Sequence, residues 1–296
     1  MGELAALATS GFWAITSVLF TFAGRRVGSV VVNRTRLVLG VILIGCAHYL
    51  SQGALFPRDA APERWMWLSI SGVIGLVLGD ASLFQAFVMI GPRLSMLLMA
   101  LVPVLSTFLA WVFLGESLRM IEVGAIMITV SGIAWVVMEQ NGDGQKKRGK
   151  GYFLGILAGF GGALGQAVGL ITAKRGLVGD FPALSGLMIR MVAATSVMWI
   201  ATVLARRSKD TFSALQDRRA LLWIVAASVT GPFLGVWMSL LAIDLAPVGI
   251  ASTLMGLAPV LLLPVDRLLF QKRIGLHAVG GTLLAIFGVA LIFFNG

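Results

Sequence analysis

The fold is decided by residues 92–138, PRLSMLLMALVPVLSTFLAWVFLGESLRMIEVGAIMITVSGIAWVVM. Two apolar runs of membrane-spanning length meet there at a polar tripeptide, residues 115–117, and Pro103 lies inside the first run. A related sequence, VGIASTLMGLAPVLLLPVDRLLFQKRIGLHAVGGTLLAIFGVALIFF, follows at residues 248–294. Adding 156 to a residue number brings the two copies into register, so that Pro103 meets Pro259. The chain therefore contains an internal repeat.

The repeat extends beyond these two stretches. The same shift of 156 residues pairs Trp67 with Trp223, Gly75 with Gly231, Gly79 with Gly235, Ala86 with Ala242, Met99 with Met255, Gly124 with Gly280 and Gly132 with Gly288. Each half contains an odd number of predicted helices, so the second half enters the membrane from the opposite side. Inverted repeats of this kind are typical of secondary transporters. We predict a first repeat at residues 1–139, a linker at 140–150 and a second repeat at 151–296.

Composition excludes a water-soluble protein. Hydrophobic residues make up 58% of the chain and charged residues 12%, with a mean hydropathy of +0.94. A soluble domain has about 25% charged residues. Because a membrane-spanning helix needs about 20 apolar residues, the sequence predicts an all-α polytopic membrane protein with ten helices. Their expected limits are residues 3–23, 30–51, 66–89, 93–113, 119–138, 151–173, 182–205, 220–242, 248–269 and 275–294.

The net charge of +10 is assigned to membrane topology and not to nucleic-acid binding, because the basic residues lie in the connections between apolar runs. Seventeen Lys and Arg residues lie on one predicted side and five on the other. We expect the protein to lie in the inner membrane of the cell. The positive-inside rule then places both termini outside and the 140–150 linker in the cytoplasm. A homodimer is compatible with the sequence.

No catalytic or metal-binding motif is evident. The single cysteine, Cys46, excludes an intrachain disulfide and a cysteine-based metal cluster. Neither a phosphate-binding loop nor a metal-spaced cluster of His and Asp is found, so we expect no cofactor, no metal and no ATP-driven transport by this chain alone. We also expect that it is not an enzyme.

Asp80 is the strongest candidate for a functional residue. It lies within the apolar run IGLVLGDASLF, where a carboxylate costs about 2.5–3.5 kcal/mol on insertion scales. Asp80 is a candidate to carry a coupled proton or to bind a substrate ammonium group; the alternative is a structural hydrogen bond to a neighbouring helix. An ion pair with Arg190, a second charged residue at membrane depth, is compatible with the sequence.

Other candidates to line a substrate cavity are polar or large side chains away from the helix ends. A structural packing role is the alternative for each of them. They are Trp13, Phe84, Gln85, Phe160, Gln166 and Trp237, together with Met99 and Met255, whose flexible side chains suit a deformable lining. Pro103 and Pro259 each remove a backbone hydrogen bond, so they are candidate hinges or static bends. Gly161, Gly165 and Gly169 predict a close-packing face on the sixth helix.

Several short motifs also occur in an order and spacing that is specific when taken together. They are Gly79-Asp80, Phe84, Ala86, Gly91, Ser95, Pro103 and Leu114-Gly115-Glu116, then Gly231-Pro232, Leu234-Gly235, Ala246-Pro247, Gly249, Ala251-Ser252-Thr253, Pro259 and Pro264. In these residues the chain resembles the ten-helix EamA-type branch of the drug/metabolite transporter superfamily. The resemblance implies that helices 1, 3, 4, 6, 8 and 9 line a central cavity, while helices 5 and 10 are peripheral. One departure is Lys272, which stands where Glu116 would repeat.

The function we expect is secondary active transport of a small organic metabolite by alternating access. An amino acid or a related amphipathic compound is the expected substrate, with coupling to protons through Asp80. Export is favoured over import by what the resemblance implies and not by any residue. The alternatives are a passive channel, which predicts flux without saturation, and an integral-membrane enzyme.

Overall fold

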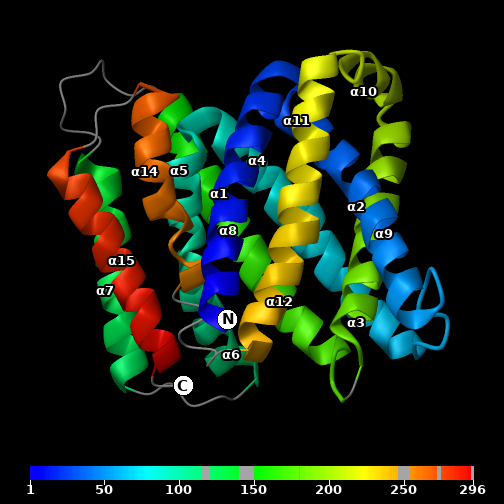
Figure 1. The fold of residues 1–296 in the computed structure, drawn as a ribbon, viewed down its shortest axis with the longest axis horizontal. Helices are drawn as coiled ribbons and strands as arrows, with labels where there is room; N and C mark the ends of the chain where they lie inside the picture. Colours follow the sequence, from blue (N-terminus) through cyan, green and yellow to red (C-terminus); the bar gives the residue numbers. More distant parts are fainter. Residues whose placement is uncertain (115–119, 140–149, 180, 246–253, 272–274, 295–296) are drawn as a thin grey trace.

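A computed structural model of the chain is a bundle of helices, shown in Figure 1. It describes residues 1–114, 120–139, 150–179, 181–245, 254–271 and 275–294, and no strand is present among them. The helices of the first half are α1 (Gly2–Val27), α2 (Ser29–Gln52), α3 (Pro62–Gly72), the π-helix η1 (Val73–Gly79), α4 (Asp80–Ile90), α5 (Pro92–Met99), α6 (Leu101–Leu114) and α7 (Met120–Glu139). Those of the second half are α8 (Lys150–Gly176), α9 (Ala183–Leu204), α10 (Ser208–Ala214), α11 (Arg218–Ser228), the π-helix η2 (Val229–Gly235), α12 (Val236–Leu245), α14 (Ala258–Leu268) and α15 (Leu276–Phe294).

The helical prediction is confirmed, although the count of ten spans is only partly matched. Within the described ranges, eight helical segments are long and apolar enough to cross a membrane. The tenth predicted helix corresponds to α15, whose apolar stretch Leu276–Leu291 is shorter. The ninth, predicted at 248–269, lies partly outside the described residues, and α14 covers its second part. One further helix, α10, occupies a segment that the sequence had suggested was a plain connection.

Two π-helical segments interrupt equivalent spans. The segment η1 lies between α3 and α4, and η2 lies between α11 and α12. Their limits, Val73–Gly79 and Val229–Gly235, differ by the same 156 residues that relate the two sequence copies. Because π-helical turns are rare and frequently occur at functional sites, their duplication shows that the repeat is present in the backbone as well as in the sequence.

The helices α7 and α15 are related by the same shift and pack against each other, at the left edge of Figure 1. A Cβ atom added to Gly132 would lie 2.5 Å from the backbone nitrogen of Ala285. A Cβ atom added to Gly288 would lie 2.6 Å from the backbone nitrogen of Thr129. Since Gly132 is equivalent to Gly288 and Thr129 to Ala285, the two helices make the same close contact in both directions. An approximate two-fold axis therefore passes between them.

Single glycines form two tight connections at one end of the bundle. Gly28 separates α1 from α2 and Gly91 separates α4 from α5, both with φ of 88°. Only glycine adopts this backbone conformation without steric cost. We call the end of the bundle that contains Gly28 and Gly91 the hairpin end; it is at the top in Figure 1, and the N-terminus is at the opposite end.

Some predictions concern residues that the structure does not describe. Glu116 and Lys272, at which the two sequence copies differ, lie outside the described residues. The predicted linker 140–150 lies outside them as well, except for Lys150, at which α8 begins.

Candidate functional site

A cavity of about 580 Å³ lies in the middle of the bundle. Residues from both repeats line it, including the equivalent pairs Met99 and Met255, and Pro103 and Pro259. All six helical segments expected to line the cavity contribute to it. Helices α2 and α9 also contribute. So does α15, through Ile286 and Val289, although the tenth predicted helix, to which it corresponds, was expected to be peripheral.

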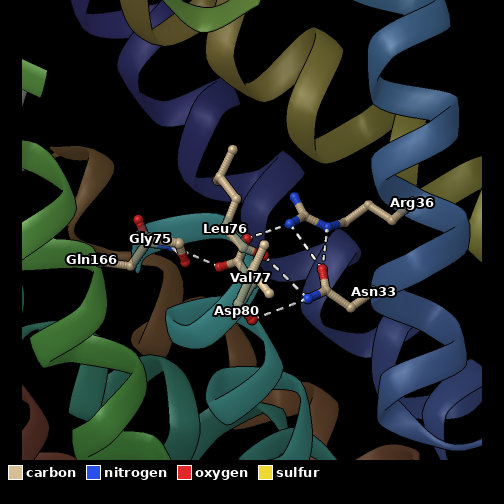
Figure 2. A network of polar contacts seen from close by, with 7 residues as sticks. All are labelled: Asn33, Arg36, Gly75, Leu76, Val77, Asp80 and Gln166. Atoms are coloured by element: carbon tan, nitrogen blue, oxygen red, sulfur yellow. Dashed lines mark hydrogen bonds and ion pairs between the residues drawn. The ribbon is translucent and has the colours of Figure 1, made fainter. Parts of the chain in front are cut away.

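The polar wall of the cavity is centred on Asp80, the first residue of α4. Its carboxylate forms an ion pair with Arg36 of α2, whose guanidinium also donates hydrogen bonds to Asn33 Oδ1 at 3.1 and 3.3 Å. The second carboxylate oxygen of Asp80 accepts a hydrogen bond of 2.6 Å from Gln166 Nε2 of α8. Both oxygens of Asp80 are therefore engaged, and Figure 2 shows this network.

The same amide side chains hold the π-helical segment η1. Gln166 Nε2 lies 3.3 Å from the carbonyl oxygen of Gly75, and Asn33 Nδ2 donates to the carbonyl oxygen of Leu76 at 3.1 Å (Figure 2). A widened helical turn disturbs the regular backbone ladder, and side chains that bond to its carbonyl groups satisfy their hydrogen-bonding capacity. The network thus connects α2, η1, α4 and α8 at one point beside the cavity.

Arg190 of α9 lines the same wall. A Cβ atom on Gly75 would lie 3.4 Å from Arg190 Nη2 and 3.7 Å from Gln166 Oε1, so both groups approach η1 from the cavity side. The guanidinium interacts electrostatically with Asp80, but no ion pair joins Arg190 to a carboxylate in the described ranges. Its Nε atom is buried and has no hydrogen-bond partner among the described residues.

The remaining lining is mostly apolar and aromatic. Phe84 packs against Phe20 in a tilted pair, at 4.7 Å between ring centroids, and stacks on Phe87 at 5.8 Å. Arg36 lies over the ring of Phe84 at 5.2 Å from its centroid, in cation–π geometry. Trp13 of α1 lies against η2, since a Cβ atom added to Gly235 would lie 2.8 Å from the indole nitrogen of Trp13. The cavity therefore joins one charged wall to a large apolar surface.

Comparison with protein families shows to which family the chain belongs. The model of the EamA-like transporter family matches residues 1–138 and again residues 153–294, so it accounts for both repeats. The chain belongs to the EamA-like transporter family. It is accordingly a multi-pass membrane protein that transports small molecules.

Structural comparison agrees with the EamA assignment at the level of the fold. A solved crystal structure, described only as that of a protein, is similar with a TM-score of 0.67 and 19% sequence identity. The similarity covers 99% of this chain and 96% of the other. No curated protein matches the chain.

The residues predicted for the site of this EamA-like chain divide into two groups. The structure brings Trp13, Asp80, Phe84, Met99, Gln166 and Met255 to the cavity, together with the candidate hinges Pro103 and Pro259. It places Gln85, Phe160 and Trp237 outside the cavity lining. Phe160 and Trp237 are 43% and 57% exposed, and Gln85 accepts a 2.6 Å hydrogen bond from Ser29.

Helix geometry explains this division. Phe84 follows Asp80 by four residues and lies about 40° from it around the helix, whereas Gln85 lies about 140° away. Phe160 precedes Gln166 by six residues, which places the two about 120° apart around α8. Residue type alone therefore did not predict which candidates line the cavity. Their position on the helix face of Asp80 or Gln166 was the more useful signal.

Sequence reasoning missed a second buried ion pair. Arg93 at the start of α5 lies 2.9 Å from Asp266 of α14, and the two side chains are 5% and 1% exposed. The pair lies beside Gly91, at the hairpin end. Asp266 is a carboxylate within an apolar run, as Asp80 is, so the rule that singled out Asp80 also applies to Asp266.

Further contacts join helices at the hairpin end. Phe22 of α1 packs against Trp223 at 5.4 Å and Phe270 at 5.5 Å between ring centroids. Arg26 donates a hydrogen bond of 2.6 Å to Asp217, the N-cap residue of α11. This hydrogen bond, with those from the backbone N–H groups at the cap, lowers the pKa of the exposed Asp217 carboxyl below its usual value.

Proposed function

We propose that the chain is a secondary active transporter that moves a small amphipathic metabolite, such as an amino acid, out of the cell by alternating access. The central cavity would hold the substrate, and its two ends would open in turn. Proton coupling through Asp80 forms part of the proposal. The orientation that we adopt places the hairpin end in the cytoplasm, because Arg25 and Arg26 belong to the more basic side of the sequence.

The observation that carries this proposal is that equivalent residues of both repeats line one cavity. Met99 and Pro103 face the cavity from the first repeat, and Met255 and Pro259 face it from the second. In an inverted repeat each half can adopt the conformation of the other, which exchanges the open and closed ends around a fixed central site. A lining drawn from both halves is what that exchange requires.

The ion pair of Asp80 suggests how a proton would act. Protonation of Asp80 removes the charge that Arg36 pairs with, so Arg36 would then separate from α4. Because Asp80 also accepts a hydrogen bond from Gln166, its protonation would loosen α4 from both α2 and α8. A proton gradient could in this way bias the equilibrium between the two conformations.

Transport by reconstituted protein tests the proposal. Proteoliposomes on solid-supported membranes would be exposed to a panel of amino acids, nucleosides and organic cations, with counterflow measured for substrates that move no net charge. We expect currents or counterflow that saturate with concentration for at least one class. Flux that rises linearly without saturation would instead indicate a passive channel, and no flux for any class would contradict a transport function for these compounds.

A further inference from the structure

The charged groups that line the central cavity do not balance. The described lining residues include two arginines, Arg36 and Arg190, and one carboxylate, Asp80. An arginine side chain stays protonated in proteins, so the described part of the wall carries a formal surplus of one positive charge. At the depth of a membrane-embedded cavity an uncompensated charge is costly, and an opposite charge nearby lowers that cost.

The surplus charge is located on Arg190. Arg36 is engaged by Asp80 and by Asn33, and both oxygens of Asp80 are already occupied by Arg36 and Gln166. Arg190 forms no ion pair within the described part of the chain, and its buried Nε atom has no hydrogen-bond partner there. Its donors therefore remain to bind a group that enters the cavity.

We propose that Arg190 binds the carboxylate of an amphipathic organic acid, a step that rests on the transport function proposed above. A guanidinium presents paired N–H donors that match the two oxygens of a carboxylate, and such charge-assisted bonds are stronger than neutral ones. The apolar part of the molecule lies against Phe84, Met99 and Trp13. A substrate whose only charge is positive meets two arginines and an already paired carboxylate, and is excluded.

Four compounds with the same aromatic body separate these charges: 3-phenylpropionate, phenylalanine, 3-phenylpropanamide and 2-phenylethylamine. Their aliphatic counterparts are 4-methylpentanoate, leucine, 4-methylpentanamide and 3-methylbutylamine. Binding to the purified full-length chain would be measured at pH 7 from the concentration dependence of the thermal unfolding temperature. We expect the two compounds with a carboxylate in each set to bind about ten- to a hundredfold more tightly than the amide, because hydrogen bonds to charged groups are stronger.

Variants of Arg190 assign the preference to that side chain. In Arg190→Gln we expect the acid and its amide to bind equally, and in Arg190→Lys we expect a reduced preference for the acid. Arg175→Gln is the matched control, since it removes one exposed arginine that lies over Trp67 outside the cavity. It should keep the wild-type preference. A merely structural role for Arg190 would weaken binding of acid and amide alike.

The outcomes distinguish this inference from the function on which it rests. Equal binding of acid and amide by the wild-type chain, or binding of none of the eight compounds, overturns the role of Arg190 without bearing on transport. A preference for the acid that persists in Arg190→Gln overturns it as well. If Arg190→Gln does not fold, Arg190→Lys decides, because an undiminished preference for the acid in that variant also overturns the role of Arg190. Absence of saturable flux for any compound in proteoliposomes would contradict the transport function instead.

Discussion

The two π-helical segments have the same backbone and different chemistry. Both are seven residues long, both follow an α-helix, and each contacts a helix of the other repeat: η1 contacts α8 and η2 contacts α1. Asp80 follows η1, whereas the equivalent residue after η2 is Val236. On the facing helices, Gln166 lies against η1 while Trp13 lies against η2.

This difference between η1 and η2 distinguishes the features of the repeated fold from those of the candidate site. In η2, Pro232 lacks a backbone N–H, so the regular helical ladder is broken without any charged partner. In η1 there is no proline, and amide side chains bond to the carbonyl groups of Gly75 and Leu76. Because the same backbone path arises in both ways, it belongs to the repeat, whereas the charged network that joins Asp80 to Arg36 and Gln166 forms at η1 and has no sequence equivalent at Val236 after η2. The two repeats can therefore move in equivalent ways, although the polar contacts made at η1 and η2 differ.

Replacing Asp80 gives the largest expected effect. Asp80→Asn removes the only carboxylate among the described lining residues and leaves Arg36 and Arg190 without it. Loss of one partner of a buried ion pair costs about 3–5 kcal/mol, so the unfolding temperature should fall markedly. If Asp80 carries the coupled proton, transport should also lose its dependence on a pH gradient, which currents on solid-supported membranes would measure.

The equivalent position of the second repeat supplies the control. Val236→Asn introduces the same amide into the cavity wall without touching the ion pair, and we expect the pH dependence to stay as in the wild type. The double variant Asp80→Asn/Arg36→Gln should recover part of the lost stability, because it removes one of the stranded charges. An Asp80→Asn protein with unchanged pH dependence would reject the proton role of Asp80.

A second ion pair, Arg93–Asp266, also lacks an equivalent in the sequence of the other repeat. The hairpin end has the buried pair Arg93–Asp266, while a shift of 156 residues leads from these positions to Gly249 and Ala110, which carry no charge. Asp266→Asn should therefore weaken one end only. We expect a faster reaction of a cysteine placed at Met96, in a Cys46→Ala background, with an impermeant thiol reagent added at the hairpin end.

The exposed pair at the same end is the matched comparison. Asp217→Asn removes the partner of Arg26, and exposed ion pairs contribute little. The lowered pKa of Asp217 means that its contribution is present above the unfolded-state pKa and is lost as pH falls through the folded-state pKa. At neutral pH we expect thiol labelling near the wild-type rate. Equal acceleration by Asp217→Asn and Asp266→Asn would show that the buried pair has no special role in closing this end.

The sequence was informative where a pattern repeats and silent where a contact joins distant helices. The shift of 156 residues related Met99 and Pro103 to Met255 and Pro259, and all four line the same cavity. A separate signal singled out Asp80, which is a carboxylate within an apolar run, where a charged group is costly. The partner of Asp80 was not predictable, since Arg36 lies 44 residues away and only the packing of α2 against α4 brings them together. The π-helical turns leave no rule in the sequence beyond the repeated glycine spacing.

The smallest expected effect concerns the contact between α8 and η1, where alanine substitutions at two glycines of α8 can be compared directly. A Cβ atom on Gly165 would lie 2.6 Å from the Cα of Gly79, which is backbone and cannot rotate away. A Cβ atom on Gly161, one turn earlier, would meet Ser82 at 3.6 Å, an ordinary van der Waals distance. Gly165→Ala should therefore force α8 away from η1 and cost about 1–3 kcal/mol, as overpacking does.

Gly161→Ala should leave stability unchanged or raise it slightly, because alanine favours a helix more than glycine does. Thermal unfolding of both variants in the same detergent would measure the difference. Since Gly165 precedes Gln166, displacement of α8 should also lengthen the hydrogen bond from Gln166 to Asp80, and Gly165→Ala should then alter the pH dependence of transport. If both alanines were tolerated equally, α8 would not be held against η1 by the close approach of the two backbones, and the asymmetry between η1 and η2 would rest on the charged network alone.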